Sequence, residues 1–407
     1  MTVIITFVML LIFLLAFFIL WREGLLKSTA EYIICIGLLA AAFIIRSCLL
    51  DYESDDYLMF LKPWTQFFRD NGGFAALGNY RGNYNPPYMY CLALFSYIDI
   101  NELYLIKLLS VLFDVLLAWA CMKLTSLCTD SHSKRIGCFF AVLLFPTVIL
   151  NGAYWGQCDS IYSFFGIYAL YLGLSSRPAG SMITLAASLA FKLQAVFIMP
   201  VFFILLIAKK ISLKQLLIFP AAYIVFMLPT VIAGMPFMEV MTLYVSQAGT
   251  VGDAINYNAP SLTSMIYNSA DPAGLSKLLI IAAFAFMLLV FIWAIVMRGK
   301  LNTAVVIGFA ALLAVGIPYL LPHMHDRYFF LSGMLLIVIG CIAPYYALVP
   351  LLAELASLHC YCAYFARHYL FHPRIGGEIM ALVLVLTAIF VAFSFKNKKD
   401  EFFEISS

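Results

Sequence analysis

The chain alternates long apolar runs with short polar turns along most of its 407 residues. Many of the runs extend over about 17–22 residues, which is the length that a helix needs to cross the hydrocarbon core of a bilayer. A membrane β-barrel would instead show alternating polarity in segments of about ten residues. The pattern therefore predicts an all-α polytopic membrane protein.

About 13 such segments follow one another, and we expect each of them to be membrane-embedded. They are Val3–Leu20, Ile33–Leu50, Leu103–Leu124, Ile136–Leu150, Ser160–Leu174, Ser181–Ala190, Val196–Ala208, Leu216–Ala233, Leu278–Val296, Thr303–Leu321, Tyr328–Cys341, Tyr345–Tyr364 and Glu378–Phe395. Ser181–Ala190 is too short to span alone, so we interpret it as a half-helix with Lys192 and Gln194 at its break. No repeat divides the chain, which predicts a single domain over residues 1–407.

The positions of basic residues predict the orientation of the chain. If the N-terminus lies outside, one face receives nearly all the short basic turns, as the positive-inside rule requires of the cytoplasmic face. Their basic residues are Arg22, Lys27, Lys134, Arg135, Arg177, Lys209, Lys210, Lys214, Arg298, Lys300, Lys396, Lys398 and Lys399. The two longest polar loops, residues 51–102 and 234–276, then lie together on the extracytoplasmic face.

Composition narrows the class further. Hydrophobic residues make up 64% of the chain and charged residues 11%, and the mean hydropathy is +0.99, so a soluble protein is excluded. The net charge of +3 is too small to indicate a nucleic-acid partner. The N-terminal run lacks the basic region and small-residue cleavage site of a signal peptide, and we expect it to stay as a helix.

The first outer loop opens with four acids in six residues: Asp51, Glu53, Asp55 and Asp56. A carboxylate held within hydrogen-bond reach can take the proton from a sugar hydroxyl that attacks an anomeric carbon. We expect Asp56 to be such a base, with Asp55 as the alternative. The competing interpretation is that these acids are hydrated residues at a helix end.

Two aromatic and amide-rich turns are candidates for binding a sugar or an acceptor. The turn Asn83–Tyr88 places Tyr84 and Asn85 before two prolines, and Pro87 starts a short apolar helix, Tyr88–Ile98, expected in the membrane interface. The turn Asn151–Ser160 carries Trp155, Gln157 and Asp159. Packing on the membrane surface and an interfacial aromatic belt are the alternatives.

Two cationic segments are candidates for binding a phosphate. Lys192 lies with Gln194 between apolar runs, and Arg327 follows His323 and His325 at the outer end of a span. Arginine suits a phosphate that gains charge as it leaves, whereas Lys192 would otherwise snorkel or pair within the protein. Two alternate histidines are weak support for a metal, and we predict no metal site.

Three further charges lie at membrane depth, and the cysteines are expected to be structural. Arg46 lies at membrane depth, and Lys107 and Asp114 lie two turns apart on one helix face, where we interpret Asp114 as structural. Most of the ten cysteines lie inside apolar runs, and Cys360 and Cys362 have neither zinc nor redox spacing. These cysteines are expected to pack between helices as small hydrophobic residues.

In combination these segments resemble a known family. The strings SDDYLMFLKPW, GGFAAL, NYNPPYMY, LIKLLSVLFD, NGAYWGQCDSIYSFF, FKLQAVFIMP and LPHMHDRYFF look like the bacterial group related to GPI mannosyltransferase II, within the GT-C superfamily of membrane glycosyltransferases. The resemblance covers residues 51–330. It implies the GT-C fold, a polyprenyl-phosphate sugar donor and inverting transfer on the outer face.

By position, the resemblance matches Asp56 or its neighbour Asp55 to the catalytic acid of the first outer loop. It matches Arg327 and Lys192, with His325, to basic residues that hold the donor phosphate. The family usually reads Ser-Gly-Asp-Tyr where this chain has Ser54-Asp55-Asp56-Tyr57, so both acids stay open as the base. A lipid phosphate is already a good leaving group, so a carboxylate and a cationic clamp suffice and no cofactor is expected.

The function expected from the sequence is transfer of a hexose, mannose-like by the resemblance, to a glycan, lipid or protein acceptor outside a bacterial plasma membrane. The alternatives are a transporter or lipid flippase, and a polysaccharide polymerase or ligase. A transporter favours paired halves with interrupted helices in matching positions. The chain has one clear interruption and both large loops on one face, which favours the enzyme.

Overall fold

The structure is a computed structural model that describes residues 2–80, 82, 84–248, 252, 254–266 and 271–395. Asn83 of the predicted sugar turn and the predicted basic tail from Lys396 lie outside these residues. The first half contains α1 (Thr2–Arg22), α2 (Thr29–Ser47), η1 (Tyr57–Leu61), α3 (Lys62–Asp70), η2 (Gly73–Asn79), α4 (Pro86–Phe95), α5 (Glu102–Ser126), α6 (His132–Leu143), α7 (Pro146–Ile149), η3 (Leu150–Trp155), α8 (Asp159–Leu174), α9 (Pro178–Phe191), η4 (Leu193–Phe197) and α10 (Val201–Ile207).

The second half is also mostly helical. It contains α11 (Leu213–Leu216), α12 (Ile218–Ile232), α13 (Phe237–Met241), α14 (Leu243–Ala248), β1 (Asn256–Tyr257), η5 (Leu262–Ser264), α15 (Pro272–Val296), η6 (Arg298–Lys300), α16 (Thr303–Leu320), β2 (Met324–His325), α17 (Phe330–Ile342), η7 (Pro344–Tyr346), α18 (Leu348–Ala366) and α19 (Pro373–Ser394).

The helices have the lengths expected of a multi-pass membrane protein. Within the described residues, eight helices are long and apolar enough to cross a membrane, or up to nine if the pair α6 and α7–η3, bent by 47°, counts as one span. Each of the thirteen predicted segments overlaps one or more helices. The all-α polytopic class is thus confirmed in its coarse form, and the count of 13 spans stays a prediction.

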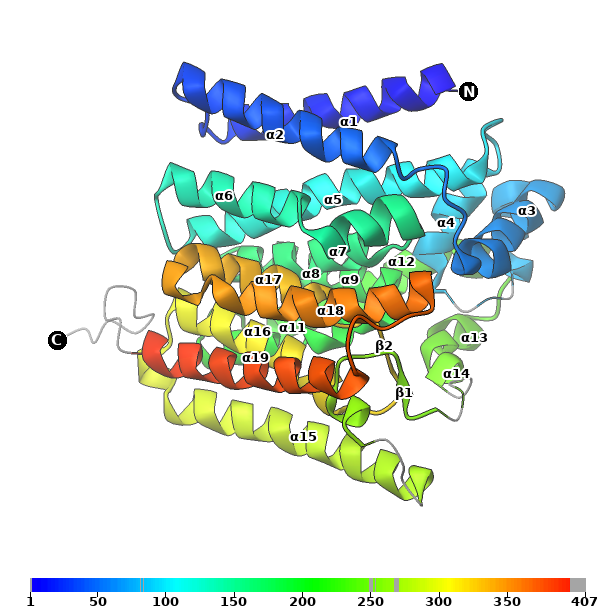
Figure 1. Cartoon of the computed structure of the whole chain (residues 1–407). Helices are drawn as coiled ribbons and strands as arrows, with labels where there is room; N and C mark the ends of the chain where they lie inside the picture. The colour runs from blue at the N-terminus through cyan, green and yellow to red at the C-terminus, as the bar shows by residue number, and fades with distance from the viewer. Residues whose placement is uncertain are drawn as a thin grey trace.

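The helices differ in how deeply they lie within the bundle. In the most apolar window of α16, 78% of the residues are buried inside the protein, against 11% for the stretch from α11 through α12. In Figure 1, α1 and α2 lie along the upper edge and α15 along the lower edge, with α16 and α17 between them. The peripheral helices therefore present apolar side chains outward, where a bilayer would cover them.

Buried polar contacts join the first helices to the bundle. Arg46 of α2 donates from Nε and Nη2 to Oδ2 of Asp114 in α5, each over 3.0 Å, and Ser160 donates to Oδ1 of Asp114. Lys107 donates instead to backbone carbonyls of the segment that follows α2, including that of Leu50 over 2.8 Å. Asp114 is therefore structural, as expected, and its charged partner is Arg46 and not Lys107.

The predicted outer loops lie at the same end of the bundle. In Figure 1, α3, α4, α13, α14, β1 and β2 gather at the right-hand end of the long helices. The predicted short helix in residues 88–98 corresponds to α4, which starts at Pro86 and has seven of its ten residues buried. It contacts α3, α9 and α12, so this expected interfacial helix is largely covered by protein.

A short parallel strand pair joins the loop of residues 234–276 to the turn between α16 and α17. Asn256 and Tyr257 of β1 pair with Met324 and His325 of β2. Asp326 N also donates to the carbonyl of Tyr257 over 3.1 Å. This pairing brings the loop of residues 234–276 against the segment that carries Arg327.

Candidate functional site

A cavity of about 480 Å³ opens among the loops and turns at this end of the bundle. It is bounded by the first loop, the second loop, the turn before α17 and the end of α18. Its lining residues are Asp56, Phe60, Leu61, Trp64, Tyr84, Gln157, Asn256, Tyr257, Asn258, His325, Asp326, Arg327, Tyr328 and Tyr364. Carboxylates, a guanidinium and aromatic rings thus face one volume of the size typical of small-molecule sites.

One carboxylate oxygen of Asp56 receives most of its contacts. Gln157 Nε2 donates to Oδ2 over 2.6 Å and Trp155 Nε1 donates to it over 3.0 Å. Arg327 Nη1 lies 3.7 Å from the same oxygen. Within the described residues no side chain donates to Oδ1, so this oxygen is available to a ligand. The Asp56 carboxylate is therefore held in one orientation through Oδ2, and its Oδ1 can accept a hydrogen bond from a ligand.

The backbone around Gly156 explains how Trp155 and Gln157 reach the same carboxylate. The π-helical turn η3 ends at Trp155 and is followed by Gly156, whose φ of +79° lies in the left-handed region that favours glycine. Gln157 N then bonds back to the carbonyl of Asn151 over 2.9 Å. In addition, Ser54 Oγ donates to the carbonyl of Trp155 over 2.8 Å, which fixes the first loop against this turn.

Arg327 lies among three carboxylates and over an aromatic ring. Its Nη1 is 3.7 Å from Asp56 and 3.6 Å from Asp326, and its Nε is 3.9 Å from Asp159. Its guanidinium carbon lies 5.0 Å from the ring centroid of Trp155. Burial lowers the pKa of Arg327, but the nearby carboxylates of Asp56 and Asp326 together have a larger effect. They raise the pKa of Arg327 well above its ordinary value. Arg327 is therefore a fixed cation at the cavity wall.

Lys192 lies beside the cavity, in a smaller recess of about 60 Å³. The α9 helix ends at Phe191, and Lys192 takes an extended conformation before η4, as the predicted break requires. Its Nζ donates to Asp159 Oδ1 over 2.6 Å. The other residues that line the recess are Tyr84, Asn85, Phe191, Leu193, Gln194, Tyr244, Arg327 and Tyr328. Since Tyr84, Arg327 and Tyr328 line both volumes, the recess adjoins the cavity.

The pKa values of His325 and Asp326, the two residues before Arg327, are shifted from their ordinary values. Burial, with the nearby charges of Arg327 and Lys192, lowers the pKa of His325 to about 3, and its ring stacks on Tyr257 with centroids 4.7 Å apart. Burial raises the pKa of Asp326 to about 7 despite the opposing effect of Arg327. His325 is therefore neutral near pH 7 and can offer a hydrogen bond but no positive charge to a phosphate.

Two predicted site residues, Asp55 and His323, line neither the cavity nor the recess. Asp55 is exposed and pairs with Arg367 at the end of α18. His323 has φ +62°, its Nδ1 lies 2.7 Å from the carbonyl of Ala254, and its Nε2 lies 3.3 Å from Ser276 Oγ. The geometry thus places Asp56 and not Asp55 at the cavity, and gives His323 contacts that fasten the second loop.

Other predicted residues lie behind the cavity wall or in the recess. Trp155 and Asp159 are buried and do not line the cavity. Trp155 contacts both Asp56 and Arg327, and Asp159 contacts Arg327. Asn85 donates to Tyr223 over 2.9 Å and lines the recess with Gln194. Of the residues in these two turns, Tyr84 and Gln157 therefore line the cavity itself, while Trp155 and Asp159 position other side chains.

The sequence interpretation missed Tyr364 and the strand residues of the second loop. Tyr364 OH accepts from Asp56 N over 3.2 Å, and its ring stacks on Trp155 with centroids 4.1 Å apart. Tyr364 lies in an apolar run like many others, so no local signal identified it. The segment Asn256–Asn258 had a signal in its two asparagines beside a tyrosine, but nothing in the sequence linked it to Arg327.

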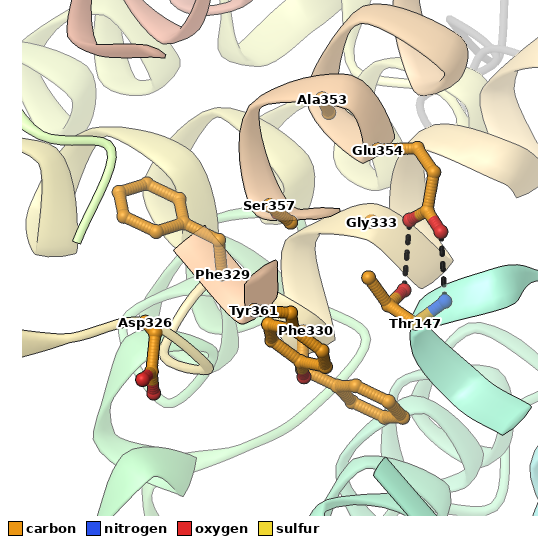
Figure 2. Close-up of a pocket in the computed structure, with 9 residues that line it drawn as sticks. All are labelled: Thr147, Asp326, Phe329, Phe330, Gly333, Ala353, Glu354, Ser357 and Tyr361. Carbon is orange, nitrogen blue, oxygen red and sulfur yellow. Dashed lines mark hydrogen bonds between the residues drawn. The ribbon is translucent and has the colours of Figure 1, made fainter. Parts of the chain in front are cut away.

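A narrow recess of about 10 Å³ lies behind Asp326. Figure 2 shows Glu354 of α18 there, with both of its oxygens accepting from Thr147: one from the backbone N over 2.7 Å and the other from Oγ1 over 2.8 Å. Thr147 lies in the first turn of α7, where backbone N–H groups lack helical partners. Glu354 therefore fixes the start of the α7–η3 segment that ends at Trp155.

The comparisons with known proteins gave no relative: no protein family and no curated protein sequence matches the chain. Among the described residues, no group of three or more His, Cys, Asp or Glu side chains is placed to hold a metal ion. The geometry of the cavity and the sequence motifs are therefore the two sources of evidence on function.

Proposed function

We propose that this chain is a GT-C-type inverting glycosyltransferase that moves a hexose from a polyprenyl-phosphate donor to an acceptor on the extracytoplasmic face of the membrane. One observation carries the proposal: the Asp56 carboxylate and the Arg327 guanidinium lie 3.7 Å apart on the wall of one outer cavity. A base and a cation in one site are the two groups that such a transfer needs.

The proposed reaction is a single displacement. The acceptor O–H bond breaks and its proton goes to Asp56 Oδ1, the oxygen that no described side chain occupies. The acceptor oxygen forms a bond to the anomeric carbon as the bond from that carbon to the phosphate oxygen breaks. The electron pair leaves with the polyprenyl phosphate, and attack from the opposite side inverts the anomeric configuration.

The leaving phosphate gains negative charge, which Arg327 and Lys192 would neutralise from adjoining volumes. Arg327 faces the cavity, and Lys192 lines the recess that shares Tyr84 and Tyr328 with it. Because both cations are held by carboxylates before the donor binds, little reorganisation would be needed during the reaction. The broken helix at Lys192 fits this role, since irregular backbone at depth is tolerated where it lines a cavity.

The aromatic side chains of the cavity suit a hexose. Trp64, Tyr84 and Tyr257 present rings to the volume, and Gln157 presents an amide beside them. Rings can stack on the apolar face of a sugar while the amide and hydroxyl groups bind its hydroxyls. Within the proposal, a mannose-like hexose and a role in cell-surface glycan assembly depend on the family resemblance alone.

The test compares two neighbouring acids. Membranes that contain the wild type, Asp56→Asn or Asp55→Asn are given radiolabelled polyprenyl-phosphate hexoses, and transfer and donor binding are measured. Asp56→Asn should slow transfer by about 10²–10⁴-fold, the usual contribution of a general base, while donor binding survives. Asp55→Asn is the matched control because Asp55 is exposed and pairs with Arg367, and it should retain transfer within about twofold.

Two outcomes would count against the proposal. Loss of transfer in Asp55→Asn with full activity in Asp56→Asn would move the base to the neighbouring residue. If the wild type binds no polyprenyl-phosphate hexose, the proposed donor class is wrong, and the transporter or flippase alternative is favoured.

A further inference from the structure

Two buried amide side chains line the recess of about 60 Å³ beside Lys192. Asn85 is fully buried and Gln194 is 8% exposed. Within the described residues, no donor reaches Asn85 Oδ1 or Gln194 Oε1, although both atoms are buried. Buried polar atoms are nearly always paired, because an unpaired one costs free energy. Two unpaired oxygens at one recess therefore indicate that a water or a ligand donates to them.

The local structure explains why the oxygen of Asn85 stays unpaired. Asn85 is the N-cap residue of α4, a position at which an asparagine oxygen usually accepts from an N–H group of the first turn. The first two helical residues, Pro86 and Pro87, have no N–H, and among the described residues the Asn85 side chain makes no cap hydrogen bond. Its Nδ2 donates instead to the hydroxyl of Tyr223 over 2.9 Å. The amide is therefore anchored by its nitrogen, and its oxygen is left for another donor.

Gln194 reaches the recess because the α9 helix breaks before it. The helix ends at Phe191, Lys192 is extended, and Gln194 lies in the short 3₁₀ helix η4. In a continuous α-helix, side chains two residues apart do not face each other. The break is therefore what allows Lys192 and Gln194 to line one recess.

The charges at the recess narrow the chemistry of the ligand. Both cations that line it already have carboxylates beside them: Lys192 Nζ donates to Asp159 over 2.6 Å, and Arg327 Nη1 lies 3.7 Å from Asp56. The unpaired atoms are carbonyl oxygens, which only accept hydrogen bonds. An ionised phosphate also only accepts, whereas a hydroxyl donates a hydrogen. The unpaired atoms of the recess therefore suit hydroxyl groups and not the phosphate.

The number of unpaired oxygens and the size of the recess restrict the ligand further. One hydroxyl supplies one hydrogen, so two oxygens need two hydroxyls. In a hexose the 4-hydroxyl and the 6-hydroxyl project from one edge of the ring, away from the anomeric carbon. The recess has room for roughly four water-sized groups, since each needs about 10–15 Å³. That is enough for these two hydroxyls but not for the whole ring.

The adjoining cavity of about 480 Å³ has room for the ring itself. Tyr84 and Tyr328 line both volumes, so a ring in the cavity can extend one edge into the recess. Asp56 lines the cavity but not the recess. A hexose placed in this way has its anomeric carbon on the side of Asp56 and its opposite edge beside the two amides.

We propose that the recess binds the edge of the donor hexose that carries the 4-hydroxyl and the 6-hydroxyl, and that Asn85 and Gln194 determine specificity for these groups. The inference rests on the proposed function, since it takes the ligand to be a hexose on a lipid phosphate. Each hydroxyl donates to one amide oxygen. Lys192 stays paired with Asp159 and acts on the phosphate through its charge.

The test measures donor binding to the full-length chain in detergent, without acceptor, so that no transfer is needed. The probes are polyprenyl-phosphate mannose, glucose and galactose, and the hexose that binds most tightly is compared with its 4-deoxy and 6-deoxy forms on the same lipid. The variants Gln194→Met and Asn85→Leu each replace an amide by an apolar side chain of similar size. Gln66→Met is the matched control, because Gln66 is exposed on α3 and lines neither volume. Thermal unfolding reports the folding of each variant.

In the wild type, each deoxy donor should bind about 10-fold or more weakly than the parent hexose, because one buried oxygen then stays unpaired. Gln194→Met should reduce the preference for one of the two hydroxyls to less than about threefold, and Asn85→Leu should do the same for the other hydroxyl. Gln66→Met should keep both preferences. Since each preference is a ratio of affinities within one variant, a smaller folded fraction does not produce this pattern.

Three outcomes would overturn the inference. If the wild type binds the parent hexose and both deoxy forms equally, the donor of the proposed function stands, and water satisfies the two amides. If both preferences persist in Gln194→Met and in Asn85→Leu, or if Gln66→Met loses them as well, other residues select the hydroxyls. If the wild type binds none of the three hexose donors, the proposed function fails and this inference fails with it.

Discussion

Asp159 holds both cations of the candidate site: Lys192 Nζ bonds to its Oδ1 over 2.6 Å, and Arg327 Nε lies 3.9 Å from its Oδ2. Asn151 Nδ2 donates to Oδ2 over 2.7 Å. Since Asp159 is 1% exposed, its charge is compensated almost entirely by these side chains. Asp159 therefore positions the proposed phosphate-binding groups without touching the phosphate itself.

The first prediction concerns this pair. Lys192→Gln leaves the buried Asp159 carboxylate without its closest cation and should destabilise the protein by about 3–5 kcal/mol. Lys192→Gln/Asp159→Asn should recover most of that loss, because no uncompensated charge remains. Thermal unfolding in one detergent checks this. If the double variant is no more stable than Lys192→Gln, the pair is not coupled in the way that we describe.

The second prediction concerns Asp326 and pH. When Asp56, Asp159 and Asp326 are all ionised, the cluster with Arg327 and Lys192 carries one net negative charge, whereas a protonated Asp326 makes it neutral. Because burial raises the pKa of Asp326 to about 7, we expect donor binding to weaken as pH rises through about 7. His325 is already neutral there and contributes no charge. Donor affinity measured from pH 6 to 8 checks the trend.

The matched variant for this prediction is Asp326→Asn, which should make donor affinity independent of pH over this range. The same shift affects stability. The Asp326 carboxyl keeps its proton in the folded protein at pH values above its ordinary pKa of 3.8. Its contribution to the free energy of unfolding is therefore fully present below pH 3.8 and is lost as the pH rises through about 7. If the Asp326→Asn variant shows the same dependence of donor affinity on pH as the wild type, another group is responsible for the titration.

The third prediction concerns the hydrogen bond from Trp155 to Asp56. Trp155→Phe keeps an aromatic ring for Tyr364 and Arg327 but removes the N–H donor, and a bond to a charged acceptor contributes about 1.5–3 kcal/mol. If Asp56 is the base as proposed, we expect kcat to fall about 10-fold or more with little change in KM for the donor, because Asp56 loses an orienting hydrogen bond while Arg327 and Lys192 keep their partners.

Tyr154→Phe is the control for that change, because Tyr154 stacks on Tyr52 with centroids 3.8 Å apart and does not line the cavity. It should leave both kinetic constants near those of the wild type. An equal fall in kcat for the two variants would point to general disturbance of this turn instead of a positioning role for Trp155.

The sequence was sufficient to predict the parts of the fold that depend on local pattern. Apolar runs predicted the helices, and the two prolines predicted the start of α4. The lysine between apolar runs predicted the break after α9. These features follow from hydrophobic periodicity and from the backbone limits of proline, which act over a few residues. The number of membrane crossings depends on helix tilt and length, which the pattern leaves open.

The candidate site was predictable only in part, because it is built from distant segments. Asp56, Gln157 and Arg327 had a signal as polar residues at the outer ends of apolar runs. The choice between Asp55 and Asp56 depended on which of them faces inward, and that is decided by Trp155, Gln157 and Tyr364. Tyr364 is separated from Asp56 by 308 residues, and pattern within a segment carries no information on such pairing.

The contact between Tyr364 and Asp56 also sets an order for biosynthesis. At about 5–20 residues per second, the ribosome needs roughly 15–60 s to make the 308 residues that separate them. During that time the first outer loop has been translated without the side chains of Tyr364 or Arg367, which come from the last helices. The last contact of Asp56 is therefore made late in synthesis, and a nascent chain that stops before α18 would keep Trp155, Gln157 and Arg327 but lack the hydroxyl of Tyr364.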